Sequence, residues 1–420
     1  MLDIARIRTD FPILQQEVNG HPLVYLDNAA TTQKPHQVLA ALSAANTKEC
    51  ADLCRSTRSA HTLSQLATER FEAVREKVRR FIAAPSAREI IFTRGTTESI
   101  NLLAQTLGRS RLQPGDEVLV SGLEHYSNHG PWQQICAERG ARLRIIPLTA
   151  DGQVELAQAA ELLTPRVRIV SISHVGNVFG TVVPVAEIAR LAHRCGALII
   201  VDGAQAPAHL RIDVGALGCD FYTFSGHKLY GPSGVGVLWG RASLLEQLPP
   251  WQCGGDMALP GSQDGPVFRA IPHKFEAGTP PVAGVIGLGA ALDFIKDCGR
   301  AAIAAHEACL YEHGRRVLSA LAAECGLQLL GGAVPTVPML AFTVDGISPF
   351  DLAAALDLEG IAVQAGHHCA HSLMQHLGVA ATLRISLACY NTVAELDALA
   401  AALPANIRRL RQAPSSGSSP

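Results

Sequence analysis

Lys228 lies in the segment SGHKLYGPSG (225–234), which follows a predicted strand and leads into a turn rich in glycine and proline. Its small neighbours leave room for the lysine amine to form an imine, one of the covalent modes that enzymes use. A solvated lysine on a turn is the simpler interpretation of this segment alone. The choice between an imine-forming lysine and a solvated lysine therefore depends on the polar residues at other predicted strand ends.

The segment RGTTESINLLAQTL (94–107) runs from a strand end through a glycine and two threonines into a helix. The free N–H groups and the positive dipole at the start of a helix can hold a phosphate group. Thr96 and Thr97 are therefore candidate phosphate ligands. An ordinary helix capped by one of these threonines explains the same pattern.

Three more polar side chains follow predicted strands, where ligands of open α/β sheets collect. Asp202 ends the apolar run ALIIVD and could either pair with a protonated pyridine nitrogen or cap a helix. Asn177 could reach a cofactor oxygen or a substrate carboxylate. His125 could stack on a pyridine ring, although most histidines are only structural. Together with Lys228 and the phosphate seat, these residues indicate a site for pyridoxal 5′-phosphate (PLP).

These side chains can meet only if their strands end at one edge of a sheet. Helical patterns such as 183–196 separate short β-branched runs. Alternating strands and helices predict an α/β fold with a mostly parallel sheet that is covered on both faces. The predicted strands are 89–93, 117–121, 142–148, 168–175, 197–202, 220–225 and 234–240.

A smaller α+β C-terminal domain is predicted from a long Ala-rich helix pattern that starts near Ala290. Strands near 339–344, 360–364 and 383–388 and a closing helix at 392–403 follow it. We expect residues 1–30 to pack with the small domain and 31–289 to form a large PLP-binding domain. We expect 290–410 to form the small domain and 411–420 to be a disordered tail.

The composition argues against several other classes of protein. A net charge of −2 over 420 residues offers no basic field for a nucleic acid. No apolar run reaches the ~18 residues of a membrane span, and charges interrupt the N-terminal stretch where a signal peptide would be apolar. Eleven cysteines without a CxxC pair do not resemble a secreted disulfide framework. We expect a cytoplasmic protein with no nucleic-acid or membrane partner.

One of the cysteines, Cys369 in AGHHCAHSLM, is a candidate nucleophile. With His367, His368 and His371 it first suggests a metal site, but zinc sites usually draw paired ligands from two segments, and no second half is present. We therefore expect no metal. The setting also disfavours a buried structural cysteine, and neighbouring imidazoles could help to form the reactive thiolate.

The chain resembles the class V aminotransferase-like enzymes of PLP fold type I, the aspartate aminotransferase-like fold. Within them it is similar to the group II cysteine desulfurases of the Suf/Csd kind. The resemblance runs from about residue 10 to about residue 405, and SGHKLYGP combined with GHHCA is its most specific part. The matching segments are VYLDNAATTQKP, HTLSQLAT, IFTRGTTESINL, VDGAQAPAHLRIDV, CDFYTFSGHKLYGPSGVGVLWG, HKFEAGTPPVAGVIGLGAA, AGHHCA and RISLACYNT.

The resemblance implies how the cofactor is held. Lys228 would carry it as a Schiff base and Asp202 would contact the pyridine nitrogen. Gln205 would contact the phenolic oxygen, and His125 would stack on the ring. The phosphate would be held by Thr96, Thr97, Ser225 and His227.

The resemblance also implies a subunit partner and a substrate subsite. Thr279 would reach the phosphate of the neighbouring subunit, which implies a homodimer with shared active sites. Asn177, Asn28 and Arg384 would bind the amino-acid substrate, with the planar guanidinium of Arg384 holding its carboxylate.

The implied reaction converts L-cysteine into L-alanine. Lys228 would remove the Cα proton, and Cys369 would take the sulfur as a persulfide and pass it to a sulfur-acceptor protein. Alternatives are a selenocysteine lyase or a cysteine sulfinate desulfinase, and a catalytically weakened PLP-binding scaffold for sulfur carriers. The acceptor and the pathway, such as iron–sulfur cluster assembly, are left open.

The chain departs from the family pattern at a few positions. Gln364 stands where the family usually has arginine, and the stretch Arg55–Ser59 keeps little of the usual sequence. Tyr126 and Gly176 also differ. These changes leave the PLP residues intact and bear on two open questions, the identity of the substrate and the efficiency of sulfur transfer. If the protein is simply a weakened family member, Gln364→Arg should raise desulfuration, with Arg55 as a candidate compensator in the natural chain.

Overall fold

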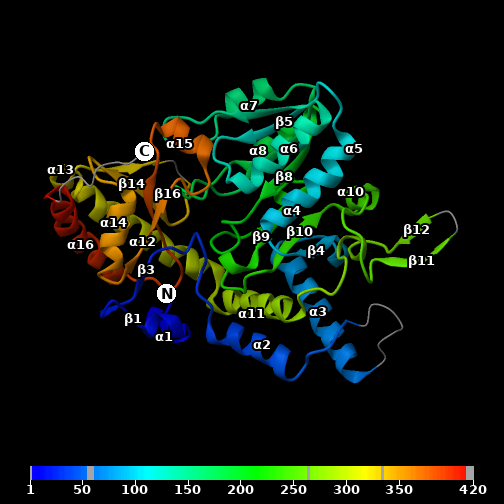
Figure 1. Cartoon of the computed structure of the whole chain (residues 1–420), viewed down its shortest axis with the longest axis horizontal. Coiled ribbons are helices and arrows are strands. Elements are labelled where there is room, and N and C mark those ends of the chain that lie inside the picture. Colours follow the sequence, from blue (N-terminus) through cyan, green and yellow to red (C-terminus); the bar gives the residue numbers. More distant parts are fainter. Residues whose placement is uncertain (1, 54–60, 263–264, 333–334, 413–420) are drawn as a thin grey trace.

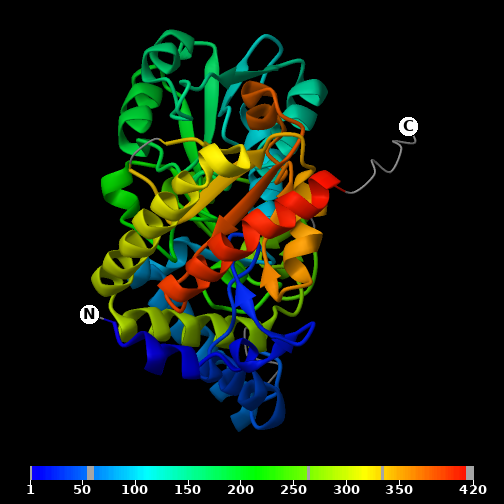
Figure 2. The same ribbon diagram turned by 90° about the vertical axis from the view of Figure 1, so that its left-hand side faces the viewer.

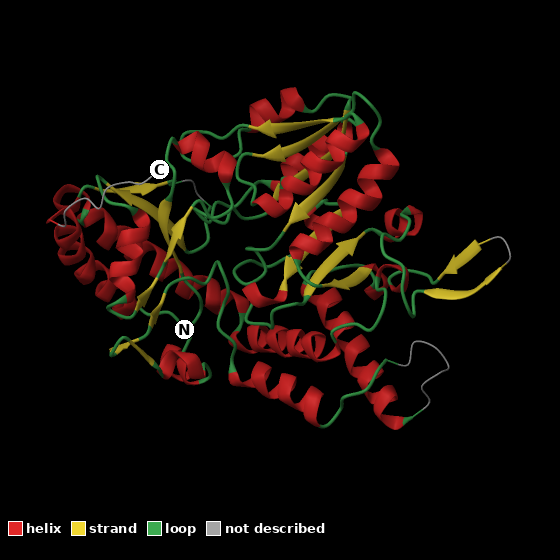
Figure 3. Cartoon of the chain, in the orientation of Figure 1, coloured by secondary structure: helices red, strands yellow, loops and turns green. Residues whose placement is uncertain are grey.

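The computed structural model describes residues 2–53, 61–262, 265–332 and 335–412, and its centre is a seven-stranded sheet (Figures 1 and 3). Strands β6, β5, β7, β8 and β9 are parallel, and β10 is antiparallel to both β9 and β4. The predicted mostly parallel sheet is confirmed, and each predicted strand lies within two residues of its predicted bounds. The order is β4 (Ile90–Thr93), β10 (Gly236–Gly240), β9 (Phe221–Ser225), β8 (Leu198–Asp202), β7 (Val167–Ser173), β5 (Glu117–Ser121) and β6 (Arg142–Ile146).

Alternate side chains of the strands enter two apolar layers, because successive residues of a strand point to opposite faces. In β5, Leu119 packs into the layer formed with α3 (Thr62–Phe81), α8 (Val185–Arg194) and α11 (Val282–Cys298). Val118 and Val120 pack into the opposite layer with α4 (Thr96–Leu103) and α6 (Gly130–Arg139). Helices thus cover both faces of the sheet and leave the strand ends as the edge that a polar ligand can reach.

A second sheet of four antiparallel strands lies beside the first (Figure 1). Its order is β13 (Leu327–Leu330), β14 (Met339–Val344), β17 (Thr382–Ser386) and β16 (Gln364–Gly366). The helices α12 (Arg300–Ala320) and α16 (Val393–Gln412) lie side by side across it (Figure 2). With α14 (Pro349–Asp357) they enclose a separate apolar core.

The predicted strand at 360–364 is two strands. The first, β15 (Ile361–Ala362), pairs in parallel with β3 (Val24–Tyr25), whereas β16 joins the small sheet. Leu26, directly after β3, is fully buried in the core of the small sheet. The N-terminal segment is therefore held against this sheet by backbone pairing and by apolar contact.

Two helices extend beyond their predicted bounds. Helix α11 starts at Val282 instead of near Ala290, so the predicted domain boundary at 289/290 falls inside it. Its buried side chains on both sides of that point, such as Leu288 and Phe294, pack into the core of the large sheet. Helix α16 continues through Pro404 to Gln412, because Leu403 and Ile407 are buried and their packing outweighs the hydrogen bond that proline removes.

No helix in the described part of the chain is long and apolar enough to cross a membrane. Shorter elements connect the layers described above. A hairpin of β11 and β12 projects from the body (Figure 1). The remaining described α-helices and strands are α1 (Ile4–Thr9), β1 (Glu17–Val18), β2 (His21–Pro22), α2 (His36–Thr47), α5 (Arg109–Arg111), α7 (Leu156–Leu162), α9 (Val214–Leu217), α10 (Ala242–Gln247), β11 (Ala258–Ser262), β12 (Gly265–Phe268), α13 (Ala322–Cys325) and α15 (His371–Leu377).

Candidate active site

A cavity of about 300 Å³ lies where the carboxyl ends of β7, β8 and β9 face strands β16 and β17 of the small sheet. This is the edge at which ligands of α/β sheets bind. The structure thus brings together most of the residues singled out in the sequence. Those that line the cavity are Thr96, Thr97, His125, Asn177, Asp202, Gln205, Ser225, His227, Lys228, Gln364, Cys369 and Arg384.

One end of the cavity is formed by the first turn of α4. Ser225 Oγ accepts a hydrogen bond from the Thr96 amide (2.9 Å) and lies 3.0 Å from Thr96 Oγ1. A Cβ on Gly236 would lie 2.4 Å from Gly95 Cα, so glycine is required where β10 passes this turn. The hydroxyls and amides at a helix start form a seat suited to a phosphate.

Lys228 follows β9 at the centre of the cavity. Burial lowers the pKa of Lys228 to about 8, and the nearby Asp202 carboxylate opposes that shift. Asp202, buried at the end of β8, accepts a hydrogen bond from the Ala204 amide (2.8 Å) through Oδ1. Burial also lowers the pKa of His125 to about 4, so its ring is neutral near pH 7. The centre therefore combines a readily deprotonated amine, a buried carboxylate and a neutral flat ring.

Arg384 lies at the other end of the cavity with only 2% of its side chain exposed. Its Nη1 donates to the Asn177 carbonyl (2.7 Å), and its Nη2 donates to Asp27 Oδ1 (3.0 Å) and to Gln364 Oε1. The Nε of Arg384 and the Oδ1 of Asn177 are buried without a partner in the described structure. The fixed guanidinium suits the carboxylate of a small ligand, and the unpaired amide oxygen can accept a hydrogen bond from a donor group of that ligand.

Cys369 is exposed and lines the same cavity. His368 and Cys369 both have left-handed backbone angles (φ of 51° and 54°), which non-glycine residues rarely adopt. Hydrogen bonds hold this turn: the Cys369 amide donates to His367 Nδ1 (3.0 Å), the Tyr126 amide donates to the Cys369 carbonyl (2.7 Å), and Asn177 Nδ2 donates to the His368 carbonyl (2.8 Å). Asn177, whose carbonyl contacts Arg384, thus also positions the turn that carries Cys369.

Metal ligation was the other interpretation of the histidines around Cys369. His367 and His371 lie with ring centroids 4.4 Å apart, and His368 Nε2 contacts Thr382 Oγ1 (2.9 Å). Within the described ranges, no group of three or more His, Cys, Asp or Glu side chains is arranged to hold a metal ion. Besides contacting each other, these rings contact Thr382, the Cys369 amide and the Tyr126 ring.

Comparison with known proteins gives the family. The class-V aminotransferase family model matches residues 24–399. The chain belongs to the class-V aminotransferase family. Within this family it is 47% identical over 403 residues to a probable cysteine desulfurase of Vibrio cholerae, which covers 96% of this chain and 98% of the relative. It is 49% identical over 401 residues to a cysteine desulfurase of Dickeya dadantii, covering 95% and 96% of the two chains.

Three further similarities extend this result. A cysteine desulfurase of Synechococcus elongatus is 48% identical over 96% of this chain, which spans 63% of that relative's length. The crystal structure of the cysteine desulfurase CsdA from Escherichia coli superposes with a TM-score of 0.87 at 40% identity, covering 98% of this chain and 100% of that one. The apo cysteine desulfurase from Thermococcus onnurineus gives 0.90 at 32% identity, covering 98% and 99%. The predicted resemblance and PLP fold type I are confirmed.

Class-V aminotransferases use PLP, and the residues of this cavity fit that cofactor. The hydroxyl and amide seat at α4 is complementary to the phosphate, and the buried Asp202 to a protonated pyridine nitrogen. Gln205 donates one N–H to the Ala29 carbonyl (2.9 Å) and keeps its second N–H for a ligand oxygen. Lys228 supplies the amine. PLP would thus be held by the side chains that the sequence singled out.

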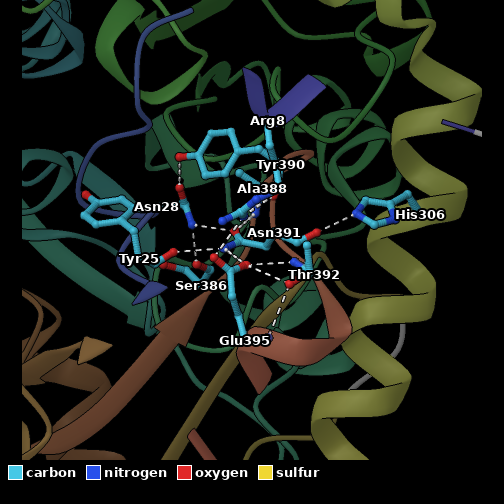
Figure 4. Close-up of polar contacts among 10 residues, drawn as sticks. All are labelled: Arg8, Tyr25, Asn28, His306, Ser386, Ala388, Tyr390, Asn391, Thr392 and Glu395. Atoms are coloured by element: carbon cyan, nitrogen blue, oxygen red, sulfur yellow. Dashed lines mark hydrogen bonds and ion pairs between the residues drawn. The ribbon is translucent and has the colours of Figure 1, made fainter. Parts of the chain in front are cut away.

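Asn28 does not line the cavity, although it was predicted to contact the substrate. Its Nδ2 donates to the Ser386 carbonyl (2.7 Å) and to Asn391 Oδ1 (3.0 Å), and its Oδ1 accepts from the Tyr390 hydroxyl (Figure 4). The preceding residue, Asp27, faces Arg384 instead. Sequence reasoning missed Asp27, although a carboxylate directly after a strand in VYLDNAATT was a usable signal.

The remaining predicted residues lie elsewhere. Thr279 is exposed and lines a separate depression with Glu98 and Trp251, so its contact with a neighbouring subunit stays a prediction. The stretch Arg55–Ser59 lies outside the described residues. Sequence reasoning also missed Ser127, Ser173 and His368 as lining residues.

Proposed function

We propose that this chain is a PLP-dependent cysteine desulfurase, which converts L-cysteine into L-alanine and carries the sulfur as a persulfide on Cys369. The observation that carries the proposal is that one cavity holds Lys228, Arg384 and Cys369. These provide an amine, a carboxylate-binding group and a thiol. An amino-acid substrate with a sulfur atom presents the complementary groups.

Different side chains of the cavity would bind the substrate and transfer its proton. Arg384, fixed by Asp27 and by the Asn177 carbonyl, would bind the α-carboxylate of the substrate. Lys228, whose pKa burial lowers to about 8, would take the Cα proton and return a proton later. When bound, PLP supplies an aldehyde for amines and a ring that accepts the electron pair released at Cα.

Cys369 would attack the sulfur of the bound substrate as a thiolate. A sulfur–sulfur bond forms and the Cβ–sulfur bond breaks. The electron pair of the broken bond stays with carbon, which gains a proton and leaves as L-alanine. The exposed position of Cys369 supports subsequent transfer of the sulfur to an acceptor protein.

The assembly and the location are also part of the proposal. A homodimer would complete each active site if Thr279 reaches the phosphate of the neighbouring subunit, and the absence of Thr279 from its own cavity supports this arrangement. The cytoplasm suits a thiol that has to stay reduced, and the described cysteines are free.

Purified protein incubated with L-cysteine should release alanine and sulfide in equal amounts when a thiol is present. When no thiol is added to reduce the persulfide, mass spectrometry should locate one additional sulfur on Cys369. Cys369→Ala should retain PLP and lose sulfide release, whereas Cys309→Ala, at another exposed cysteine, should retain both. Wild-type rates in Cys369→Ala would contradict the persulfide step. Turnover of selenocysteine alone would identify a selenocysteine lyase, and PLP binding without turnover of either substrate would identify a scaffold.

A further inference from the structure

Gln364 and Arg384 are direct cross-strand partners in the small sheet. The antiparallel pairing of β16 with β17 places Gln364 opposite Arg384. Directly opposite residues project from the same face of a sheet. Both side chains line the cavity, and Gln364 Oε1 accepts a hydrogen bond from Arg384 Nη2.

The hydrogen bonds of Arg384 leave few N–H groups for a ligand. A guanidinium has five N–H groups, and its Nη2 carries two of them. Asp27 Oδ1 and Gln364 Oε1 occupy both of those on Nη2. The Asn177 carbonyl takes one N–H of Nη1, so one N–H of Nη1 and the unpartnered Nε–H remain.

A carboxylate binds a guanidinium most strongly through two parallel N–H groups. The end-on pair consists of Nη1 and Nη2, and the side-on pair consists of Nε and Nη2. Both pairs contain Nη2. A substrate carboxylate can therefore bind Arg384 in a bidentate manner only if Asp27 or Gln364 gives up its Nη2 hydrogen.

Gln364 is the partner that can leave. Asp27 contributes a full negative charge, and charge-assisted hydrogen bonds are stronger than those of a neutral amide. Asp27 also precedes the Ala29–Ala30 backbone, which is tied to β17 by the Ala29 amide bonded to Ser386 Oγ (2.8 Å). Gln364 is only half-buried and offers a neutral amide, so its hydrogen bond to Arg384 is the easier of the two to break.

We propose that Gln364 is a displaceable cap on Arg384. Its amide oxygen holds Nη2 in place before the substrate arrives, and the α-carboxylate of the amino acid then replaces it. Gln364 thereby sets how tightly α-amino acids bind, and ligands without a carboxylate leave it in place. This inference rests on the proposed function for the identity of the substrate.

Two substitutions at position 364 should change the competition for Arg384 Nη2 in opposite directions. Gln364→Leu removes the competing oxygen, while Asp27 and the Asn177 carbonyl still hold Arg384. Gln364→Glu replaces the cap with a carboxylate that competes permanently for Nη2. Gln328→Glu is the matched control, because Gln328 is exposed on β13 at the far edge of the same sheet.

The probes are L-alanine, which binds without desulfuration, and cysteamine, which has the amine and thiol of cysteine but no carboxylate. Binding to the PLP-loaded enzyme is followed by calorimetry and by the change in cofactor absorbance. We expect Gln364→Leu to lower the Kd of L-alanine about three-fold and Gln364→Glu to raise it about ten-fold. Gln364→Leu should change the Kd of cysteamine less than about two-fold, since no carboxylate reaches Arg384. For L-cysteine these variants should change KM more than kcat.

The proposed displacement of Gln364 from Arg384 is contradicted if Gln364→Leu binds L-alanine as tightly as, or more weakly than, wild type. It is also overturned if Gln364→Leu changes cysteamine binding as much as L-alanine binding, or if a crystal structure with L-alanine shows Gln364 Oε1 still on Arg384 Nη2. Sulfide release from L-cysteine in the same samples tests the proposed function separately. A wild type that binds L-alanine but releases no sulfide fails that function, and its Kd values still decide the role of Gln364.

Discussion

Asp27 Oδ1 lies 3.0 Å from Arg384 Nη2, although 357 residues separate the two along the chain. The backbone at Asp27 forms a parallel bridge with Ser386 of β17, which places the segment after β3 beside the strand that carries Arg384. The two ends of the chain thus build the proposed carboxylate subsite together.

Asp27→Asn should raise the KM for L-cysteine about ten-fold and change kcat less, because a neutral amide orients Arg384 through weaker hydrogen bonds. Steady-state kinetics checks this split. Asp293→Asn is the control: Asp293 pairs with Lys77 on the surface, with both side chains more than 40% exposed, so its KM should equal that of wild type. An unchanged KM in Asp27→Asn would show that Asn177 and Gln364 suffice to hold Arg384.

Lys228→Ala should bind PLP without a covalent link and lose at least about 100-fold in activity, because no other amine lines the described cavity. Borohydride treatment followed by peptide mass spectrometry should attach the cofactor to Lys228 in wild type and to no residue in the variant. Lys296→Ala, at an exposed position of α11, should behave as wild type. Covalent cofactor in Lys228→Ala would assign the role to a different lysine.

Glu124 should make stability depend on pH. It is buried beside the cavity, where Ser173 and Asn128 donate hydrogen bonds to its carboxylate, and burial raises its pKa to about 7. The folded state therefore keeps a proton that the unfolded chain loses near its ordinary pKa of 4.5. The stabilisation that this proton provides is present below about pH 4.5 and is lost as the pH rises through about 7.

The free energy of unfolding of wild type, minus that of Glu124→Gln, should fall by about 3 kcal/mol between pH 4.5 and pH 8. Urea unfolding of both proteins across this range measures the difference, in which the other titrating groups cancel. Glu161→Gln, at an exposed position of α7, should give a constant difference. A constant difference for Glu124→Gln as well would contradict the raised pKa of Glu124 in the folded protein.

Asn28→Ala should lower the free energy of unfolding by about 1–3 kcal/mol, because it removes the buried acceptor of the Tyr390 hydroxyl and the side-chain donor to the Ser386 carbonyl. The KM for L-cysteine should stay as in wild type, since Asn28 does not line the cavity. Asn46→Ala, at an exposed helix position, should change stability by less than about 0.5 kcal/mol. A raised KM with unchanged stability would restore the substrate contact that the resemblance implied.

Gln364→Arg should lower the catalytic efficiency for L-cysteine by about ten-fold, the opposite of what a weakened family member would show. The structure places position 364 against the Arg384 guanidinium, so a second guanidinium there would repel it from Asp27 and Asn177. Steady-state kinetics with L-cysteine shows whether the catalytic efficiency of Gln364→Arg falls or rises. A faster enzyme would show that the cavity has room to separate the two charges.

The sequence alone determined the elements and the chemical groups. Alternating apolar runs located the seven strands of the large sheet within two residues, because strand and helix periodicity is set by near neighbours in the chain. The same runs placed Asp202 and Ser225 at strand ends and Lys228 just beyond one, and so at one edge of a parallel sheet. Cofactor chemistry was thus readable from residue types and local spacing.

Only the tertiary structure decided which side chains meet across the two sheets. Asp27 and Asn28 are adjacent in sequence, yet only Asp27 faces Arg384, because their side chains diverge where the chain leaves β3 and packs against β17. Gln364 acquires its role from its register opposite Arg384, and local periodicity does not specify pairing between distant strands. The split of residues 361–366 between two sheets has the same origin, since β3 pairs with Ile361–Ala362 and β17 pairs with Gln364–Gly366.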